Sequence, residues 1–146
     1  MFGLLKKKRL SVTHDGGFHA DDVFACAALQ IYLDGLNEAY DVVRTRNPKI
    51  IDKADYVFDV GGIYDPALNR FDHHQKGRAG TRENGIMYAA SGLIWKHFGE
   101  KLCKSKTMME ILDKKVFQPL DAADNGQDIS KRLVGDIYPY AVRAII

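Results

Sequence analysis

The chain has 146 residues, of which 46% are hydrophobic and 27% charged, and this composition fits one globular domain with a single sizeable core. The formal net charge of +2 neither demands nor excludes a polyanionic partner. Cys26 and Cys103 stand far apart with no second cysteine near either, which excludes a disulfide framework or a zinc knuckle and suits a reducing cytoplasm.

A basic cluster, Lys6-Lys7-Lys8-Arg9, precedes the first apolar segment. That segment is far too short for a signal peptide or a membrane span, so the sequence predicts a soluble, cytoplasmic protein. We interpret the cluster as a solvated leader to the first strand, with a nucleic-acid arm as the less common alternative.

Apolar spacing predicts strands that alternate with helices along the chain. The expected strands are residues 9–13, 41–45, 56–60 and 70–72. The expected helices are residues 20–33, closed by Gly35, then 48–53, 86–98 with Gly99 as the stop, 107–116, and 117–123 after a break near Pro119. Residues 75–85 are interpreted as a mobile loop. This order predicts an α/β fold of three layers, α/β/α, with a mostly parallel sheet covered on both faces.

The tripeptide Asp72-His73-His74 places one carboxylate and two imidazoles at the end of the fourth expected strand. Neighbouring residues on a strand point to opposite faces, so at most two of the three side chains reach one site unless the backbone turns. Further ligands elsewhere must therefore decide whether these residues bind a metal.

Other acids and imidazoles stand where apolar elements end, which is where open α/β sheets assemble their sites. They are His14, His19, Asp21, Asp59 and Asp124. Taken singly, His19 is better explained as a surface or capping residue and Asp124 as a turn residue, and a capping role for Asp59 remains an alternative. Their co-occurrence favours a metal site. The three imidazoles and three carboxylates suffice for two divalent ions if one carboxylate bridges, and they are His14, His19, His73, Asp21, Asp59 and Asp124.

Asp59 is the natural bridge because it ends the most apolar strand, where a lone ionised carboxylate is costly. A carboxylate and imidazole set without thiolate favours Mn²⁺ or Mg²⁺, while Fe²⁺, Co²⁺ or Zn²⁺ also fit, and Mn²⁺ is our first choice. Two ions held about 3.5 to 4 Å apart bind a phosphoryl oxygen and generate a hydroxide nucleophile. The pattern therefore predicts hydrolytic phosphorus chemistry.

A long ordered series of motifs resembles the DHH phosphoesterase superfamily and, within it, the MYG1-like exonucleases (UPF0160 type). The resemblance extends from about Val12 to Gly126. It is carried by Thr13-His14, Phe18-His19-Ala20-Asp21, Val43-Arg44-Thr45-Arg46, Asp59-Val60-Gly61-Gly62, Asp72-His73-His74-Gln75, Ser91-Gly92-Leu93-Ile94 and the segment from Asp121 to Gly126.

The resemblance implies a phosphodiester hydrolase, an exonuclease acting on RNA, DNA or short oligonucleotides. By similarity the first metal takes His14, His19 and Asp59. The second metal takes Asp21, Asp59, His73 and Asp124. His74 then faces the phosphate, so that Asp59, His73 and His74 form the catalytic set. His19 stands where the superfamily has an aspartate, as it does in MYG1-like proteins.

Basic residues near this expected site are candidates for substrate binding. Arg44 and Arg46 end the second strand, and Lys76, Arg78 and Arg82 follow the Asp-His-His run. A flexible cationic loop beside two metals would hold a polyanion. A solvated loop explains the last three residues equally well.

Two alternatives remain open. A small-nucleotide or pyrophosphate hydrolase would use the same metals, and a metal-binding interaction module would need a partner subunit. The second arises because relatives carry a further, substrate-binding domain, for which a single domain of residues 1–146 leaves little room. A homodimer could replace that domain through apolar tail residues such as Ile137, Val142, Ile145 and Ile146.

Overall fold

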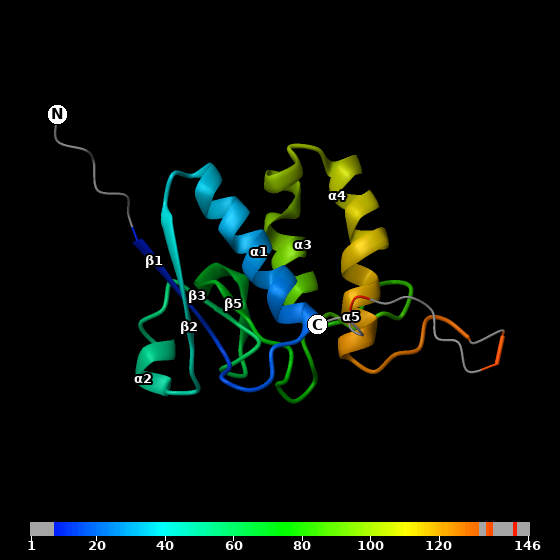
Figure 1. Cartoon of the computed structure of the whole chain (residues 1–146), viewed down its shortest axis with the longest axis horizontal. Coiled ribbons are helices and arrows are strands. Elements are labelled where there is room, and N and C mark those ends of the chain that lie inside the picture. Colours follow the sequence, from blue (N-terminus) through cyan, green and yellow to red (C-terminus); the bar gives the residue numbers. More distant parts are fainter. Residues whose placement is uncertain (1–7, 132–133, 136–141, 143–146) are drawn as a thin grey trace.

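The computed structural model describes residues 8–131, 134–135 and 142 (Figure 1). Three of the tail residues named above, Ile137, Ile145 and Ile146, lie outside the described residues. No helix in the described part of the chain is long and apolar enough to cross a membrane.

In the described part of the chain, five strands form one sheet in the order β2-β1-β3-β5-β4. They are β1 (Lys8–Thr13), β2 (Ala39–Arg44), β3 (Tyr56–Phe58), β4 (Tyr64–Asp65) and β5 (Arg70–Phe71). Neighbours from β2 to β5 pair in parallel, and β4 pairs antiparallel with β5. The predicted α/β fold with a mostly parallel sheet is confirmed, and only β4, two residues long, was not predicted.

Among the described residues, five helices connect and cover the strands, and α1 and α3 lie side by side over one face of the sheet (Figure 1). They are α1 (Ala20–Gly35), α2 (Pro48–Ile51), α3 (Ala90–Cys103), α4 (Lys106–Leu112) and α5 (Gln118–Asp124). A π-helical turn, Asp113–Phe117, joins α4 to α5, which accommodates Pro119 in the first turn of α5.

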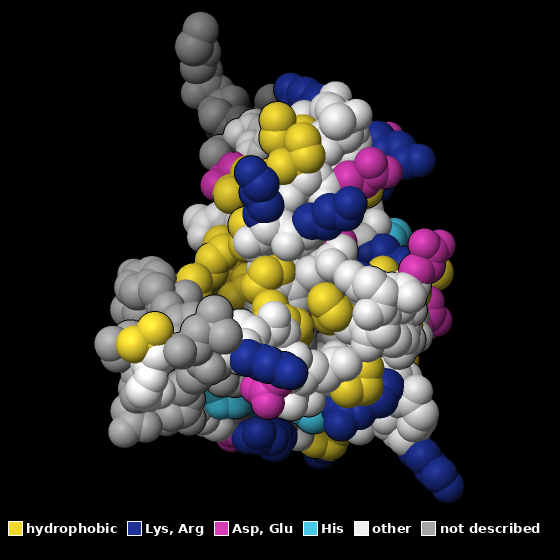
Figure 2. All heavy atoms as spheres, turned by 90° about the vertical axis from the view of Figure 1, so that its right-hand side faces the viewer, with side chains coloured by type: hydrophobic (Ala, Val, Ile, Leu, Met, Phe, Trp, Pro, Cys, Tyr) yellow, Lys and Arg dark blue, Asp and Glu magenta, His cyan; other side chains and the backbone are white. Residues whose placement is uncertain are grey.

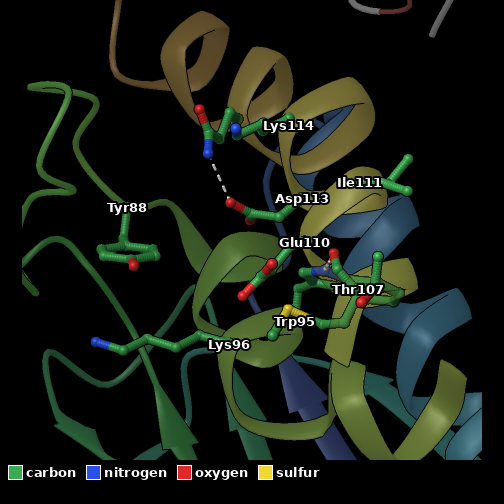
Figure 3. Close-up of a pocket in the computed structure, with 10 residues that line it drawn as sticks. Tyr88, Trp95, Lys96, Thr107, Glu110, Ile111, Asp113 and Lys114 are labelled. Carbon is green, nitrogen blue, oxygen red and sulfur yellow. Dashed lines mark hydrogen bonds between the residues drawn. The ribbon is translucent and has the colours of Figure 1, made fainter. Parts of the chain in front are cut away.

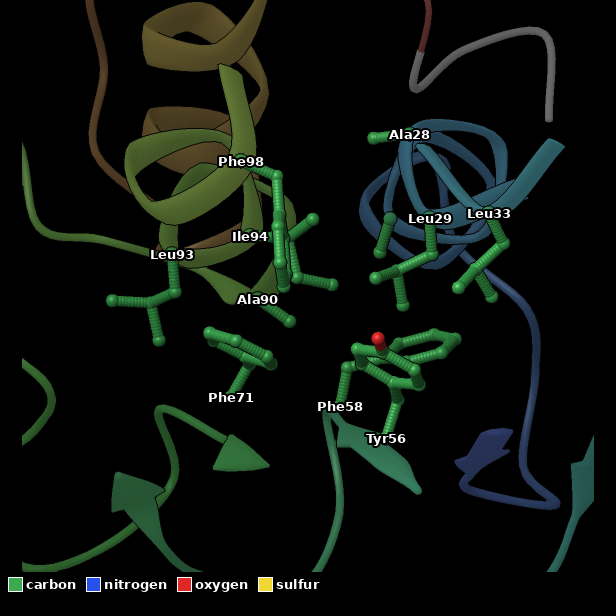
Figure 4. Close-up of a cluster of buried hydrophobic side chains, with 11 residues drawn as sticks. Ala28, Leu29, Leu33, Tyr56, Phe58, Phe71, Ala90, Leu93, Ile94 and Phe98 are labelled. Carbon is green, nitrogen blue, oxygen red and sulfur yellow. The ribbon is translucent and has the colours of Figure 1, made fainter. Parts of the chain in front are cut away.

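The main core lies between the sheet and the pair α1 and α3 (Figure 4). Phe58 and Phe71 rise from the central strands and are 0% exposed, and they meet Leu29 of α1 and Leu93 of α3, which are also 0% exposed. Each such side chain contributes about 2 kcal/mol through burial. A second, smaller cluster around Val57 packs against Ile50 and Ile51 of α2.

The prediction that Gly99 stops a helix of residues 86–98 is wrong. Helix α3 begins at Ala90, passes through Gly99 and ends at Cys103, where Lys104 takes a positive φ of 51°. A Cβ atom at Gly99 would lie 2.8 Å from the Trp95 ring and 2.9 Å from Met109 of α4. Gly99 therefore permits close packing of α3 against α4 instead of ending a helix.

Gly99→Ala tests this close packing. In an open helix interior alanine is more favourable than glycine by about 1 kcal/mol, so the sign of the change is informative. We expect a loss of about 1 to 3 kcal/mol in the free energy of unfolding because the new methyl group overpacks the interface. Denaturant titration measures it, with Gly35→Ala as control, since a Cβ atom there meets nothing within 4 Å. A stabilised Gly99→Ala variant would contradict the packing argument.

Candidate metal centre

The carboxyl ends of three parallel strands meet at one edge of the sheet and carry the central residues of the site. His14 follows β1, Asp59 follows β3 and His73 stands two residues after β5. Asp59 adopts a positive φ of 55°, which turns the chain sharply at the end of β3. These turns bring an acid and two imidazoles together from distant parts of the sequence.

Asp59 contacts three imidazoles. Its Oδ2 lies 3.2 Å from His14 Nε2, and its Oδ1 lies 3.1 Å from His73 Nε2 and 3.3 Å from His74 Nδ1. The side chain is only 4% exposed. Burial raises the pKa of Asp59, while the neighbouring His73 and His74 oppose that shift. The carboxylate is therefore the shared centre of the cluster.

His73 links Asp59 to a second pair of acids. Its Nε2 lies 3.2 Å from Asp124 Oδ2, and Asp21 offers an oxygen to the same group. Burial alone lowers the pKa of His73, but the carboxylates of Asp124 and Asp59 outweigh it and raise that pKa to about 10. Burial raises the pKa of Asp21, and the charges of Asp124 and Asp59 raise it further.

Three overlapping groups of ligand atoms result, each with all its atoms within 4.8 Å of one another. Among the described residues these groups are His14, Asp22 and Asp59; Asp59, His73 and His74; and Asp21, His73 and Asp124. Asp59 Oδ1 and both ring nitrogens of His73 are buried without a well-aligned hydrogen bond. Buried nitrogen and oxygen ligand atoms that lie close together without hydrogen-bonding one another fit a site for divalent cations.

His14 fits such a cation only after a local change. Its Nδ1 accepts the Gly16 N–H at 3.0 Å, so in this arrangement the proton of the neutral ring is on Nε2, facing Asp22 and Asp59. Coordination through Nε2 requires the proton on Nδ1. The Gly16 amide must then turn away.

The structure does not bring His19 into any of the three groups. His19 lies just before α1, its side chain is 66% exposed, and its Nδ1 is 3.9 Å from Asp124 Oδ1. The buried acid beside His14 is instead Asp22, which accepts bonds from the Thr13 hydroxyl and the His19 N–H. The sequence analysis missed Asp22, although its position three residues after the cap is typical of an acid that folds back on a helix start.

Asp72 binds its own loop and stays out of the cluster. It accepts N–H groups from Gly62 at 2.6 Å, from His73 at 2.7 Å and from His74 at 3.0 Å. Burial opposes ionisation of Asp72, but these donors and the His74 ring outweigh it and lower its pKa. The same carboxylate lies 2.8 Å from His74 Nδ1. Asp72 therefore makes the turn that lets both histidines face Asp59, and it leaves His74 Nε2 unengaged.

The predicted substrate-binding residues have four different environments. Arg44 donates to the carbonyls of His14 and Gly16 and lies over the Phe18 ring, so it supports the first loop. Arg46 pairs with the exposed Asp15.

Lys76 and Arg78 are exposed, and no ion pair engages either within the described part of the chain. Arg82, by contrast, is only 7% exposed and pairs with Asp113 and Asp121. For Arg82 the interpretation as a solvated loop residue was wrong, because its acidic partners come from much later in the sequence.

Comparison with known proteins identifies the family. A family model for MYG1 exonucleases, described as an uncharacterised protein family (UPF0160), matches residues 11–141. The chain belongs to this family. The MYG1 protein of Dictyostelium discoideum is 35% identical over 141 residues, covering 87% of this chain and 40% of that protein. The MYG1 exonuclease of Homo sapiens is 36% identical over 132 residues, covering 78% of this chain and 35% of that protein.

The MYG1 protein of Chlamydia pneumoniae is 38% identical over 122 residues, which is 82% of this chain and 38% of that protein. The chain thus spans well under half the length of these curated relatives. No solved structure gives a significant match.

The raised pKa of His73 predicts a pH dependence for the metal-free protein. The folded value of about 10 exceeds the ordinary 6.5, so the stabilisation is complete below pH 6.5 and is lost as the pH rises toward 10. Between pH 7 and 9 the free energy of unfolding should fall by up to about 1.4 kcal/mol per pH unit.

Denaturant titrations in excess chelator measure this slope, and His73→Gln should flatten it. An unchanged slope in that variant would show that another group titrates.

Proposed function

We propose that this chain is the catalytic domain of a metal-dependent phosphodiester hydrolase of the DHH superfamily, acting as an exonuclease on RNA, DNA or short oligonucleotides. The observation that carries the proposal is the buried Asp59 carboxylate, which contacts His14, His73 and His74 at 3.1 to 3.3 Å. The names of the human and bovine relatives, MYG1 exonuclease, support it.

Two divalent cations, Mn²⁺ by preference, complete the proposed centre. The donor set of carboxylates and imidazoles without thiolate suits Mn²⁺, and Mg²⁺, Co²⁺, Fe²⁺ and Zn²⁺ are the alternatives. Such ions supply Lewis acidity and activate water for attack on phosphorus. Asp59 and His73 each belong to two ligand groups, so we assign them the central holding roles.

His74 is proposed to orient the phosphate. Asp72 holds its Nδ1 at 2.8 Å, which directs Nε2 away from the buried loop, and the side chain is 58% exposed. In its imidazolium form Nε2–H donates to a phosphoryl oxygen. The histidine thus combines a fixed ring orientation with access to solvent.

Lys76 and Arg78 are proposed to bind the phosphate backbone. They stand two and four residues after His74 in the chain, are exposed, and engage no carboxylate among the described residues. Figure 2 shows histidine side chains at the lower edge of one face, with Lys and Arg side chains around them. Exposed cations so close to His74 in the chain favour a polyanionic substrate, with the salt dependence that such contacts bring.

Asp59→Ala tests the proposed activity. Protein stripped of metal and resupplied with Mn²⁺ is assayed on a labelled single-stranded RNA, its DNA counterpart and a dinucleotide. We expect Mn²⁺-dependent release of mononucleotides that falls at least about 100-fold in Asp59→Ala, because the shared ligand is lost. Asp52→Ala, an exposed acid at the end of α2, is the matched control and should retain activity.

Two other outcomes would redirect the assignment. Turnover of pyrophosphate or cyclic dinucleotides without oligonucleotides would favour the small-nucleotide hydrolase. Mn²⁺ uptake without hydrolysis of any substrate would contradict a self-sufficient enzyme and favour a module that needs a partner or a further domain.

His74→Gln separates phosphate orientation from metal binding. We expect kcat to fall about 100-fold, with Mn²⁺ affinity unchanged, because the lost group acts on the substrate. His73→Gln should instead weaken Mn²⁺ binding. Isothermal titration with Mn²⁺ and steady-state kinetics on the same preparations measure both. Equal loss of Mn²⁺ affinity in the two variants would show that His74 is a ligand.

A further inference from the structure

Helix α5 brings Asp124 to the centre, yet it is short and follows an irregular π-helical turn. A buried arginine holds it in place. Arg82 Nη1 donates to Asp121 Oδ2 of α5 at 2.5 Å, and Nη2 donates to Asp113 Oδ1 at 2.9 Å. The Arg82 and Asp121 side chains are 7% and 0% exposed. One guanidinium therefore binds both the first residue of the turn, Asp113, and Asp121 within α5.

Asp113 is itself fixed by a second bond. Its Oδ2 accepts from the Gln118 side chain at 2.7 Å, which is the dashed contact in Figure 3. That close-up shows a pocket beside α4. Its volume is about 450 Å³, and it is lined by Tyr88 and Trp95 among others and by no member of the metal centre. Asp113 and Gln118 line this pocket, whereas Arg82 and Asp121 do not.

Asp121 also binds the start of α3. Its Oδ1 accepts the Gly92 N–H at 3.1 Å, and a Cβ atom at Gly92 would lie 1.8 Å from Oδ2. The two preceding amides, of Ala90 and Ser91, donate to Asp21 at 3.1 and 2.8 Å. Consecutive amides of one helix thus hold the acid of α5 and the acid of α1, and Asp21 belongs to the same ligand group as Asp124.

The loop around Arg82 is tied to the segment after α5 as well. The Asn125 side chain donates to the Met87 carbonyl at 3.2 Å, and the Gln127 side chain accepts the Met87 N–H at 2.8 Å. The Arg82 guanidinium lies 4.0 Å from the centre of the Tyr88 ring. The loop and α5 therefore form one packed unit around Asp121.

We propose that Arg82 and Asp121 are positioning residues of the metal centre: their buried ion pair sets α5, and with it Asp124, against His73 and Asp21. The inference rests on the proposed function, in that Asp124 is taken as a metal ligand. Asp121 belongs to none of the three ligand groups, and its two oxygens accept from Arg82 and Gly92 instead. Loss of Arg82 leaves a buried unpaired carboxylate, which relaxes by moving α5.

Arg82→Met in the full chain tests the proposal, with Mn²⁺ titration calorimetry and thermal unfolding of the metal-free protein as readouts. We expect Mn²⁺ affinity to fall about 10- to 100-fold at the ion that Asp124→Asn also weakens, because supporting contacts of ligands have effects of that size. Asp121→Asn is the milder second variant. It keeps an acceptor for Gly92 and loses the charge, and it should weaken the same ion.

Arg9→Met is the matched control. It removes another part-buried arginine, which pairs with Glu38 at 2.6 Å and Asp55 at 2.8 Å. It should lower the melting temperature and leave Mn²⁺ binding unchanged. If Arg82→Met behaves in the same way, Arg82 is merely structural and the proposal is overturned. If the unmodified chain binds no Mn²⁺, the metal centre itself is overturned, which is a distinct result.

Discussion

The amino end of α3 is the point on which the arrangement of the site depends. The first amides of a helix have no partner within it, and Ala89 at this cap has no polar side chain to offer. Asp21 of α1 and Asp121 of α5 supply the acceptors. Both carboxylates are buried, and the positive end of the helix compensates them. The amino end of α3 therefore fixes both α1 and α5. The strands β3 and β5, of three and two residues, are too short to do this alone.

Near the amino end of α3 several buried carboxylates lie together, and the neighbouring histidines compensate their negative charge only in part. Burial raises the pKa of Asp59 and of Asp21. The charges of Asp124 and Asp59 raise the pKa of Asp21 further. The imidazole of His73 has its pKa raised in response. Mutually repelling buried carboxylates are unfavourable unless cations neutralise them. Folding must bring these carboxylates together against their mutual repulsion. This cost is the physical reason for expecting the cluster to bind divalent cations.

The alternation of apolar runs was enough to predict the parallel sheet, and the polar residues at the ends of those runs were enough to predict which segments meet. Local patterns could not predict the direction of each side chain. His19 and Asp22 flank the same helix start, and only the angle at which α1 leaves the loop puts the acid inside and the imidazole outside. Arg82 resembles a solvated loop residue because its partners lie 31 and 39 positions later. Gly99 resembles a helix stop because the Trp95 ring that it accommodates faces α4.

In the proposed enzyme, cation binding and substrate binding depend on different residues. The ligand groups are drawn from strand ends and helix starts that are buried and bonded to one another, so cation affinity depends on long-range packing. Lys76 and Arg78 stand on an exposed turn, and no ion pair ties them to the described part of the chain. Under the proposed function, substitution of these two exposed residues changes substrate preference without disturbing the buried ligand groups.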